Sequence, residues 1–91
     1  MNASFPKRCS DNLAAQWTEA KVADPKMIEE AFMIIYGRPA QKAELNRSEE
    51  FLKRATALYV VRSDAPDVAH KKAVSNFIQA MFSTNEFMFI E

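Results

Sequence analysis

The sequence predicts an all-α fold, a compact bundle of four main helices followed by a short C-terminal helical turn. The 91 residues contain a single glycine, whereas β folds use glycine repeatedly in the positive-φ turns that join their strands. No stretch alternates apolar and polar residues for the length of a strand, but apolar residues recur every three or four positions, as on one face of a helix. The four prolines mark where one helix gives way to the next.

Length and charge define the class of protein. A chain of 91 residues has room for one domain, and we assign residues 1–9 to a flexible N-terminal segment and residues 10–91 to a single helical domain. Hydrophobic residues (48%) and charged residues (26%) occur in the proportions of a soluble globular protein. Twelve basic and twelve acidic residues cancel, so the chain lacks the basic surface typical of proteins that bind nucleic acid or anionic membranes.

The first helix is predicted over residues 11–22. It follows the break at Pro6, and the side chains of Ser10, Asp11 and Asn12 can accept hydrogen bonds from the free amides of a helix start. Leu13, Trp17 and Ala20 lie four and three residues apart and share one face.

The second helix is predicted to begin at Asp24-Pro25 and to end at Gly37. Asp24 suits the N-cap and a proline suits the first helical position, where its missing N–H costs nothing. Gly37 suits the left-handed residue that ends a helix, and Arg38 before a proline favours extended backbone. The apolar face of this segment carries Met27, Ile28, Ala31, Phe32, Ile34 and Ile35.

The third helix is predicted from Pro39 or Ala40 to Val61, and the fourth over residues 66–82 after a break at residues 62–67. The third helix has an apolar side and a charged run, residues 47–54, which we interpret as a solvated face. Ser83 and Glu86 then match a capping box, which predicts a short last turn. Four apolar residues, 87–90, follow, and we expect this tail to fold back onto the core.

Seven large side chains are predicted to form the core: Trp17, Phe32, Ile35, Leu52, Tyr59, Phe77 and Met81. Arg38 leaves the chain at a rigid corner between Gly37 and a proline. We expect it to act as an internal clamp that binds carbonyl groups at the ends of the second and fourth helices, with Glu86 as its charged partner.

Part of the chain resembles a known group of proteins. The stretch AFMIIYGRP at residues 31–39, then Glu44-Leu45, Phe51-Leu52 and FSTNEFMFIE at residues 82–91, resemble the extreme C-terminal region of large planctomycete proteins of unknown function. Those proteins often join a cytochrome c-like domain to uncharacterised domains and tend to be exported. The resemblance covers residues 25–91, and a looser one is to small helical repeat modules of bacterial surface proteins.

The resemblance implies a helical C-terminal module and supplies no active site. This chain lacks the haem-attachment motif Cys-x-x-Cys-His, so no redox role is carried over from the larger proteins. If the chain is complete, the absence of a signal peptide predicts a cytoplasmic protein. If it is a fragment of a larger relative, the resemblance implies export.

Candidate catalytic residues are few. Cys9 and His70 are the only cysteine and histidine, which excludes an intramolecular disulfide and a Cys/His zinc site within one chain. They could meet as nucleophile and base, but an exposed thiol and a surface histidine are the simpler interpretation. Adjacent glutamates on a helix point about 100° apart, and one glycine cannot build a phosphate-binding loop. We therefore predict no enzyme activity and no catalytic, cofactor-binding or metal-binding residue.

The function predicted from the sequence is that of a soluble, non-catalytic helical interaction or scaffolding module with a protein partner. No run of 18 apolar residues is present that could cross a membrane. The alternative is a small nucleic-acid-binding protein that uses Lys7-Arg8 and Lys71-Lys72, with Trp17 and several phenylalanines elsewhere in the chain to stack on bases. This function requires these residues on one face. Methionine and phenylalanine side chains could instead line a groove for a partner helix. The oligomeric state stays open.

Overall fold

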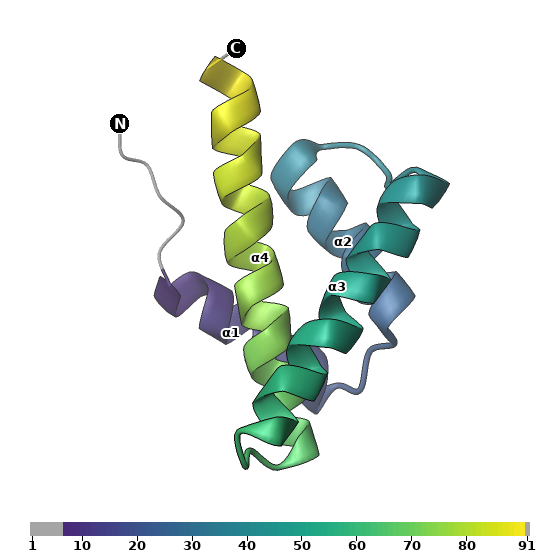
Figure 1. The fold of residues 1–91 in the computed structure, drawn as a ribbon. Helices are drawn as coiled ribbons and strands as arrows, with labels where there is room; N and C mark the ends of the chain where they lie inside the picture. The colour runs from purple at the N-terminus through teal and green to yellow at the C-terminus, as the bar shows by residue number, and fades with distance from the viewer. Residues whose placement is uncertain (1–6, 91) are drawn as a thin grey trace.

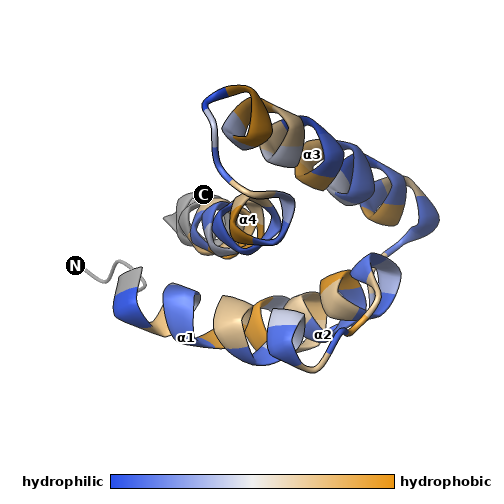
Figure 2. Ribbon diagram, turned by 90° about the horizontal axis from the view of Figure 1, so that it is seen from below, coloured by the Kyte–Doolittle hydropathy of each residue, from blue (hydrophilic) through white to orange (hydrophobic). Residues whose placement is uncertain are grey.

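Helix α4 lies between the other helices of the bundle. The computed structural model describes residues 7–90, and their side chains from residue 8 to residue 82. They form α1 (Lys7–Glu19), α2 (Asp24–Tyr36), α3 (Lys42–Val61) and α4 (Pro66–Ile90), with no strand in this range. Helix α3 packs on one side of α4, and α1 and α2 pack on the other (Figures 1 and 2). The predicted all-α class with four main helices is confirmed. Within residues 7–90, no helix combines the length and apolarity needed to span a bilayer.

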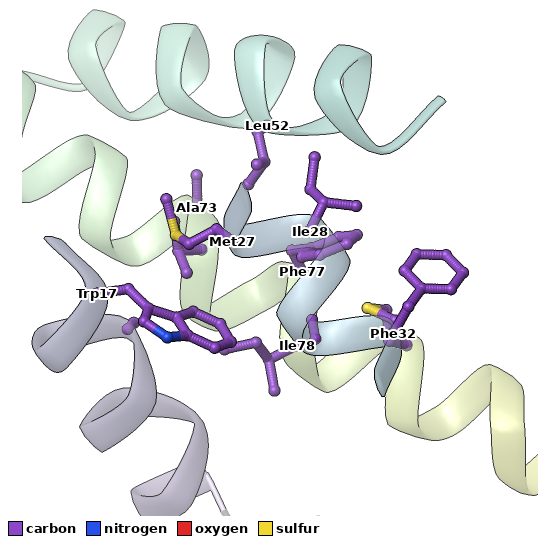
Figure 3. Packing of buried hydrophobic residues seen from close by; sticks show 12 residues of the cluster. Trp17, Met27, Ile28, Phe32, Leu52, Ala73, Phe77 and Ile78 are labelled. Carbon is purple, nitrogen blue, oxygen red and sulfur yellow. The ribbon is translucent and has the colours of Figure 1, made fainter. Parts of the chain in front are cut away.

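One hydrophobic core joins all four helices (Figure 3). Five of the seven predicted core residues are buried: Trp17, Phe32, Leu52, Phe77 and Met81. Ile35 is half-buried and packs against the edge of the core. Tyr59 is half-buried as well, because its hydroxyl accepts a hydrogen bond from Asn76 on the exposed side of α4. The remaining members of the buried cluster are Ala14, Met27, Ile28, Ala31, Ala73, Val74 and Ile78.

Helix α1 begins and ends earlier than predicted. It starts at Lys7, so that residues 7–9 are helical and Asp11 lies inside the helix. Asp11 accepts a hydrogen bond from Ser75 of α4, with an Oγ–Oδ1 distance of 2.5 Å. At the other end, Lys21 adopts a left-handed φ of +57°. This lets the N–H of Val22 bind the carbonyl of Trp17 at 3.0 Å and closes the helix before Val22.

Helix α2 has the predicted bounds, but its N-terminal contacts differ. The residue before the helix is Ala23, and the carboxylate of Asp24 binds Nε2 of His70 on α4 at 2.9 Å, so Asp24 is not the N-cap. Gly37 ends α2 as predicted. Its φ is +73°, in the left-handed region that favours glycine, and its N–H donates to the carbonyls of Phe32 and Met33.

Helix α3 starts at Lys42, two or three residues after the predicted start. Gln41 is its N-cap residue, and the backbone N–H of Gln41 donates to Oε1 of Glu44 at 2.9 Å. This is one half of a capping box, and it fixes the first turn of α3 after the corner at Pro39.

Helix α4 continues without a break to Ile90, so the separate turn predicted after Phe82 is wrong. Ser83 lies inside the helix and is not an N-cap. No glycine or proline occurs between Asp67 and Ile90 to stop the helix. The backbone does not fold back, and Figure 1 shows the last turns of α4 extending beyond the ends of α2 and α3. The predicted burial of Phe87 and its neighbours concerns side chains outside the described residues.

Candidate functional site

A hollow of about 530 Å³ opens where α2, α3 and α4 meet. It lies beside the α2–α3 corner, the connection between the C-cap residue Gly37 of α2 and the first residue of α3, Lys42. Phe51 is 39% exposed at its mouth. The apolar lining consists of Phe32, Tyr36, Phe51, Phe77, Ala80 and Met81, and the polar rim consists of Arg38, Glu44, Arg47 and Ser48.

Arg38 acts as a clamp across the α2–α3 corner. Its two terminal nitrogens donate to the two carboxylate oxygens of Glu44 at 2.9 and 2.8 Å. The guanidinium also lies 5.6 Å from the ring centre of Phe32 and 5.5 Å from that of Tyr36, within cation–π range. Both helices that meet at this corner are therefore held by one side chain.

The contacts of Arg38 correct one part of the clamp prediction. Arg38 binds Glu44, which lies in the first turn of α3 and is close in sequence, and it makes no bond to a carbonyl of α4 among the described residues. The predicted partner Glu86 has its side chain outside the described residues. The contact between this corner and α4 comes from Tyr36, whose hydroxyl donates to the carbonyl of Met81 at 3.1 Å.

Arg38 and Glu44 hold each other in their charged forms. Hydrogen bonds from Arg38, and then from the N–H of Gln41, lower the pKa of Glu44 to about 2. The hydrogen bond to Glu44 raises the pKa of Arg38 above its ordinary value. Burial of the ring raises the pKa of Tyr36, so the tyrosine remains a neutral donor. The charge of Arg38 is thus matched within the protein.

Glu44→Gln should reduce the loss of stability in acid. Because the folded-state pKa of Glu44 lies below its ordinary value of 4.5, its contribution is present above that pH and disappears as the pH falls toward about 2. The pair is solvent-exposed, so the effect should be small. Urea unfolding of both proteins across this pH range measures it. Glu50→Gln, which removes only the exposed pair with Arg54, is the matched control. Equal pH slopes for wild type and Glu44→Gln would contradict the assignment.

Arg47 carries a positive charge on the rim of the hollow. It is exposed, and it forms no hydrogen bond or ion pair with any side chain in residues 8–82. Its electrostatic influence reaches Glu44, whose pKa it helps to lower, but Glu44 is already bound by Arg38 on both oxygens. Of the two arginines on the rim, Arg38 is bound to Glu44, and the guanidinium of Arg47 is the one that can pair with an anionic group of another molecule.

A second hollow of about 380 Å³ continues from the first along α3. The two hollows share Arg47 and Phe51. Ala55 and Leu58 follow Phe51 at i+4 and i+7 on the same face of α3, and Leu58 is 62% exposed. We refer to the continuous surface as the α3 groove, lined by Phe32, Tyr36, Phe77, Ala80 and Met81 in the first hollow, and by Arg47, Phe51, Ala55 and Leu58 along α3.

Cys9 and His70 are not brought together. Cys9 is an exposed residue of α1, and its neighbour Ser10 accepts a hydrogen bond from Gln79 of α4. His70 lies more than two helical turns before Gln79 on α4, and it is bound to Asp24 at the start of α2. Among the side chains that the structure describes, those of residues 8–82, no three His, Cys, Asp or Glu side chains are grouped so as to hold a metal ion.

The basic residues of the alternative function lie in a mixed environment. Lys71 and Lys72 line a hollow of about 500 Å³ that also contains Asp11 and Tyr59. Lys72 is paired with Asp64 at 3.0 Å and lies 5.5 Å from the Tyr59 ring centre. The positive charge at this place is therefore partly neutralised. The side chain of Lys7 lies outside the described residues.

The chain was compared with known proteins at the level of families, sequences and structures. No family model, curated protein or solved structure matches it. The resemblance to the planctomycete C-terminal region stays a prediction, and the α3 groove has to be interpreted from its own geometry.

Proposed function

We propose that the protein is a non-catalytic interaction module that binds an acidic amphipathic helix of a partner protein in the α3 groove. The observation that carries this proposal is the continuity of the groove. The two hollows share Arg47 and Phe51, and Phe51 and Leu58 are exposed on one face of α3 with the half-buried Ala55 between them.

The dimensions of the groove suit a short helix. From Arg47 to Leu58, α3 rises about 16 Å at 1.5 Å per residue, which equals about three turns of a bound helix. Partner helices dock in such grooves through apolar side chains at i, i+3, i+4 and i+7. Phe51, Ala55 and Leu58 offer complementary positions at the same spacing.

The charges of the groove favour an acidic partner. Arg38 is occupied by Glu44, and Arg54 is paired with Glu50. Arg47 is left to pair with a carboxylate placed beside the apolar residues of the partner. Such a pair contributes mainly to the choice of partner and of register.

Binding of nucleic acid, the alternative suggested by the sequence, has less support. It needs a coherent basic face, whereas Lys72 is paired with Asp64 and Asp11 lines the same hollow. Addition of a single-stranded oligonucleotide to the full chain at low salt tests this alternative directly. Salt-sensitive shifts of the Lys71 and Lys72 amide resonances would favour it over the α3 groove.

Selection from a displayed library of helical peptides tests the proposed function. The wild-type chain should enrich peptides with Asp or Glu three or four positions from bulky apolar residues. Arg47→Glu should weaken binding of the selected peptides by at least about tenfold, equivalent to about 1.4 kcal/mol, and should enrich Lys or Arg in a new selection. Lys53→Glu makes the same charge change on α3 outside the groove and should leave the enriched pattern unchanged. The proposal would be contradicted if the wild-type chain selected peptides with no common pattern. It would also be contradicted if Arg47→Glu selected the same acidic pattern as the wild-type chain.

A further inference from the structure

We infer that the helix received by the α3 groove is the C-terminal segment of α4, residues 83–90, from a second copy of this chain, with each copy filling the groove of the other. This inference rests on the proposed function, because it names the occupant of the same groove. It is carried by the course of α4, by the residue types of its last turns and by the position of Arg47.

The course of α4 leaves its last turns beyond the other helices. Tyr36, the last residue of α2, binds the carbonyl of Met81, and the helix then continues to Ile90. Residues 83–90 add about 12 Å of helix at 1.5 Å per residue. In Figure 1 these turns extend past the ends of α2 and α3.

The sequence of this segment has the chemistry expected of the partner. Residues 83–90 read STNEFMFI, with four consecutive apolar residues, one acidic residue and no lysine or arginine. A helix end of this composition, extending from a small bundle, is typical of an interaction surface. Glu86 supplies the carboxylate that Arg47 lacks.

The segment cannot enter the groove of its own chain. Helix α4 itself forms one side of the groove through Phe77, Ala80 and Met81, and it runs unbroken into residues 83–90. An uninterrupted helix does not turn back onto its own preceding turns. Only a second molecule can bring this segment to the groove.

An antiparallel pairing of the two α4 helices satisfies both grooves at once. When residue 87 of one copy lies opposite Ala80 of the other, residue 90 lies opposite Phe77 and residue 86 opposite Met81. The apolar run then follows the α4 side of the groove, and Glu86 lies level with the hollow whose rim carries Arg47. Each copy gives and receives the same segment, so the arrangement is a closed two-fold dimer.

Cysteine cross-linking tests the pairing. Residues 83 and 84 lie at its centre, where each copy meets the other, so Ser83→Cys in a Cys9→Ser background should form a disulfide-linked dimer under mild oxidation. Lys53→Cys in the same background places the thiol on α3 outside the groove and should remain monomeric. Equal cross-linking of the two variants would overturn the inference.

Sedimentation of the full chain tests the charge pair. The fraction of dimer should increase with protein concentration between about 10 µM and 1 mM, because two short helix ends bury a small interface. Arg47→Glu and Glu86→Arg should each weaken the dimer about tenfold, and the double variant should restore it. A monomer at all concentrations, or no restoration in the double variant, would overturn the inference. If the chain is monomeric but still selects acidic helical peptides, the proposed function stands and only the dimer is overturned. If the double variant restores the dimer but the wild-type chain selects no library peptide, binding of a partner protein is overturned and self-association is supported.

Discussion

Leu52→Ala is expected to lower the free energy of unfolding by about 2–5 kcal/mol, the range for removing a large aliphatic side chain from a core. Leu52 is 1% exposed, and it is the large apolar side chain that α3 buries in the described core. In Figure 3 it points from α3 into the cluster formed with α2 and α4. A cavity at this position removes the one fully buried apolar side chain that α3 contributes to the described core.

Thermal and urea unfolding, followed by far-ultraviolet circular dichroism, measure this loss. In a chain of this size the melting temperature should fall by at least about 10 °C. The matched control is Leu58→Ala, the same substitution on the same helix at a side chain that is 62% exposed. Leu58→Ala should change stability by about 0.5 kcal/mol or less. Equal losses for the two variants would show that Leu52 does not anchor α3.

Trp17→Ala is expected to cost about 3–5 kcal/mol, the range for large aromatic truncations in cores. Trp17 is 8% exposed and attaches α1 to the core, together with the small Ala14. Helix α1 packs mainly on α4, so few other contacts replace those of the indole ring. The variant should unfold at a much lower urea concentration than wild type.

The same circular dichroism experiment measures the loss at Trp17, because fluorescence disappears with the only tryptophan. Leu13→Ala, at a half-buried position on the same helix, is the control and should cost clearly less. Hydrogen exchange of the α1 amides gives a second measurement, since these amides should lose protection in Trp17→Ala. A loss below about 1 kcal/mol would be outside the range for a core aromatic residue and would show that α1 is held by other contacts.

Local sequence signals predicted much of the fold. Periodic apolar residues gave the four main helices, and Gly37 fixed the end of α2 because a positive φ at that point favours glycine. The helix starts were harder to predict because capping side chains have competing partners. Asp11 binds Ser75 and Asp24 binds His70, and both partners lie more than 40 residues away in sequence.

The end of α4 shows the limit of a local motif. Ser83 and Glu86 match a capping box, but the same residue types are tolerated inside a helix when no glycine or proline interrupts it. The motif therefore permits a helix start without requiring one. The absence of glycine and proline around Ser83, and not the motif, is the sequence feature that favours the continuous helix.

The α3 groove was not predictable because α3 has two adjacent apolar stripes. Phe51 and Leu58 are spaced as Leu52 and Tyr59 are, seven residues apart. Which stripe is buried depends on the angle at which α3 crosses its neighbours. Only the packing on α4 places Leu52 inside and leaves Phe51 and Leu58 partly exposed, and with them Arg47 at the rim.

The central position of α4 also has a consequence for folding during synthesis. Helices α1, α2 and α3 all pack on α4, but the ribosome makes α4 after them, from Pro66 onward. Until then the indole of Trp17 has no α4 surface to cover it, and the contact between Ser10 and Gln79 closes a loop between residues 69 positions apart. Helix α3 and α4 are neighbours in sequence and can pair early, whereas docking of α1 has to wait. The native bundle therefore completes only after its last helix leaves the ribosome.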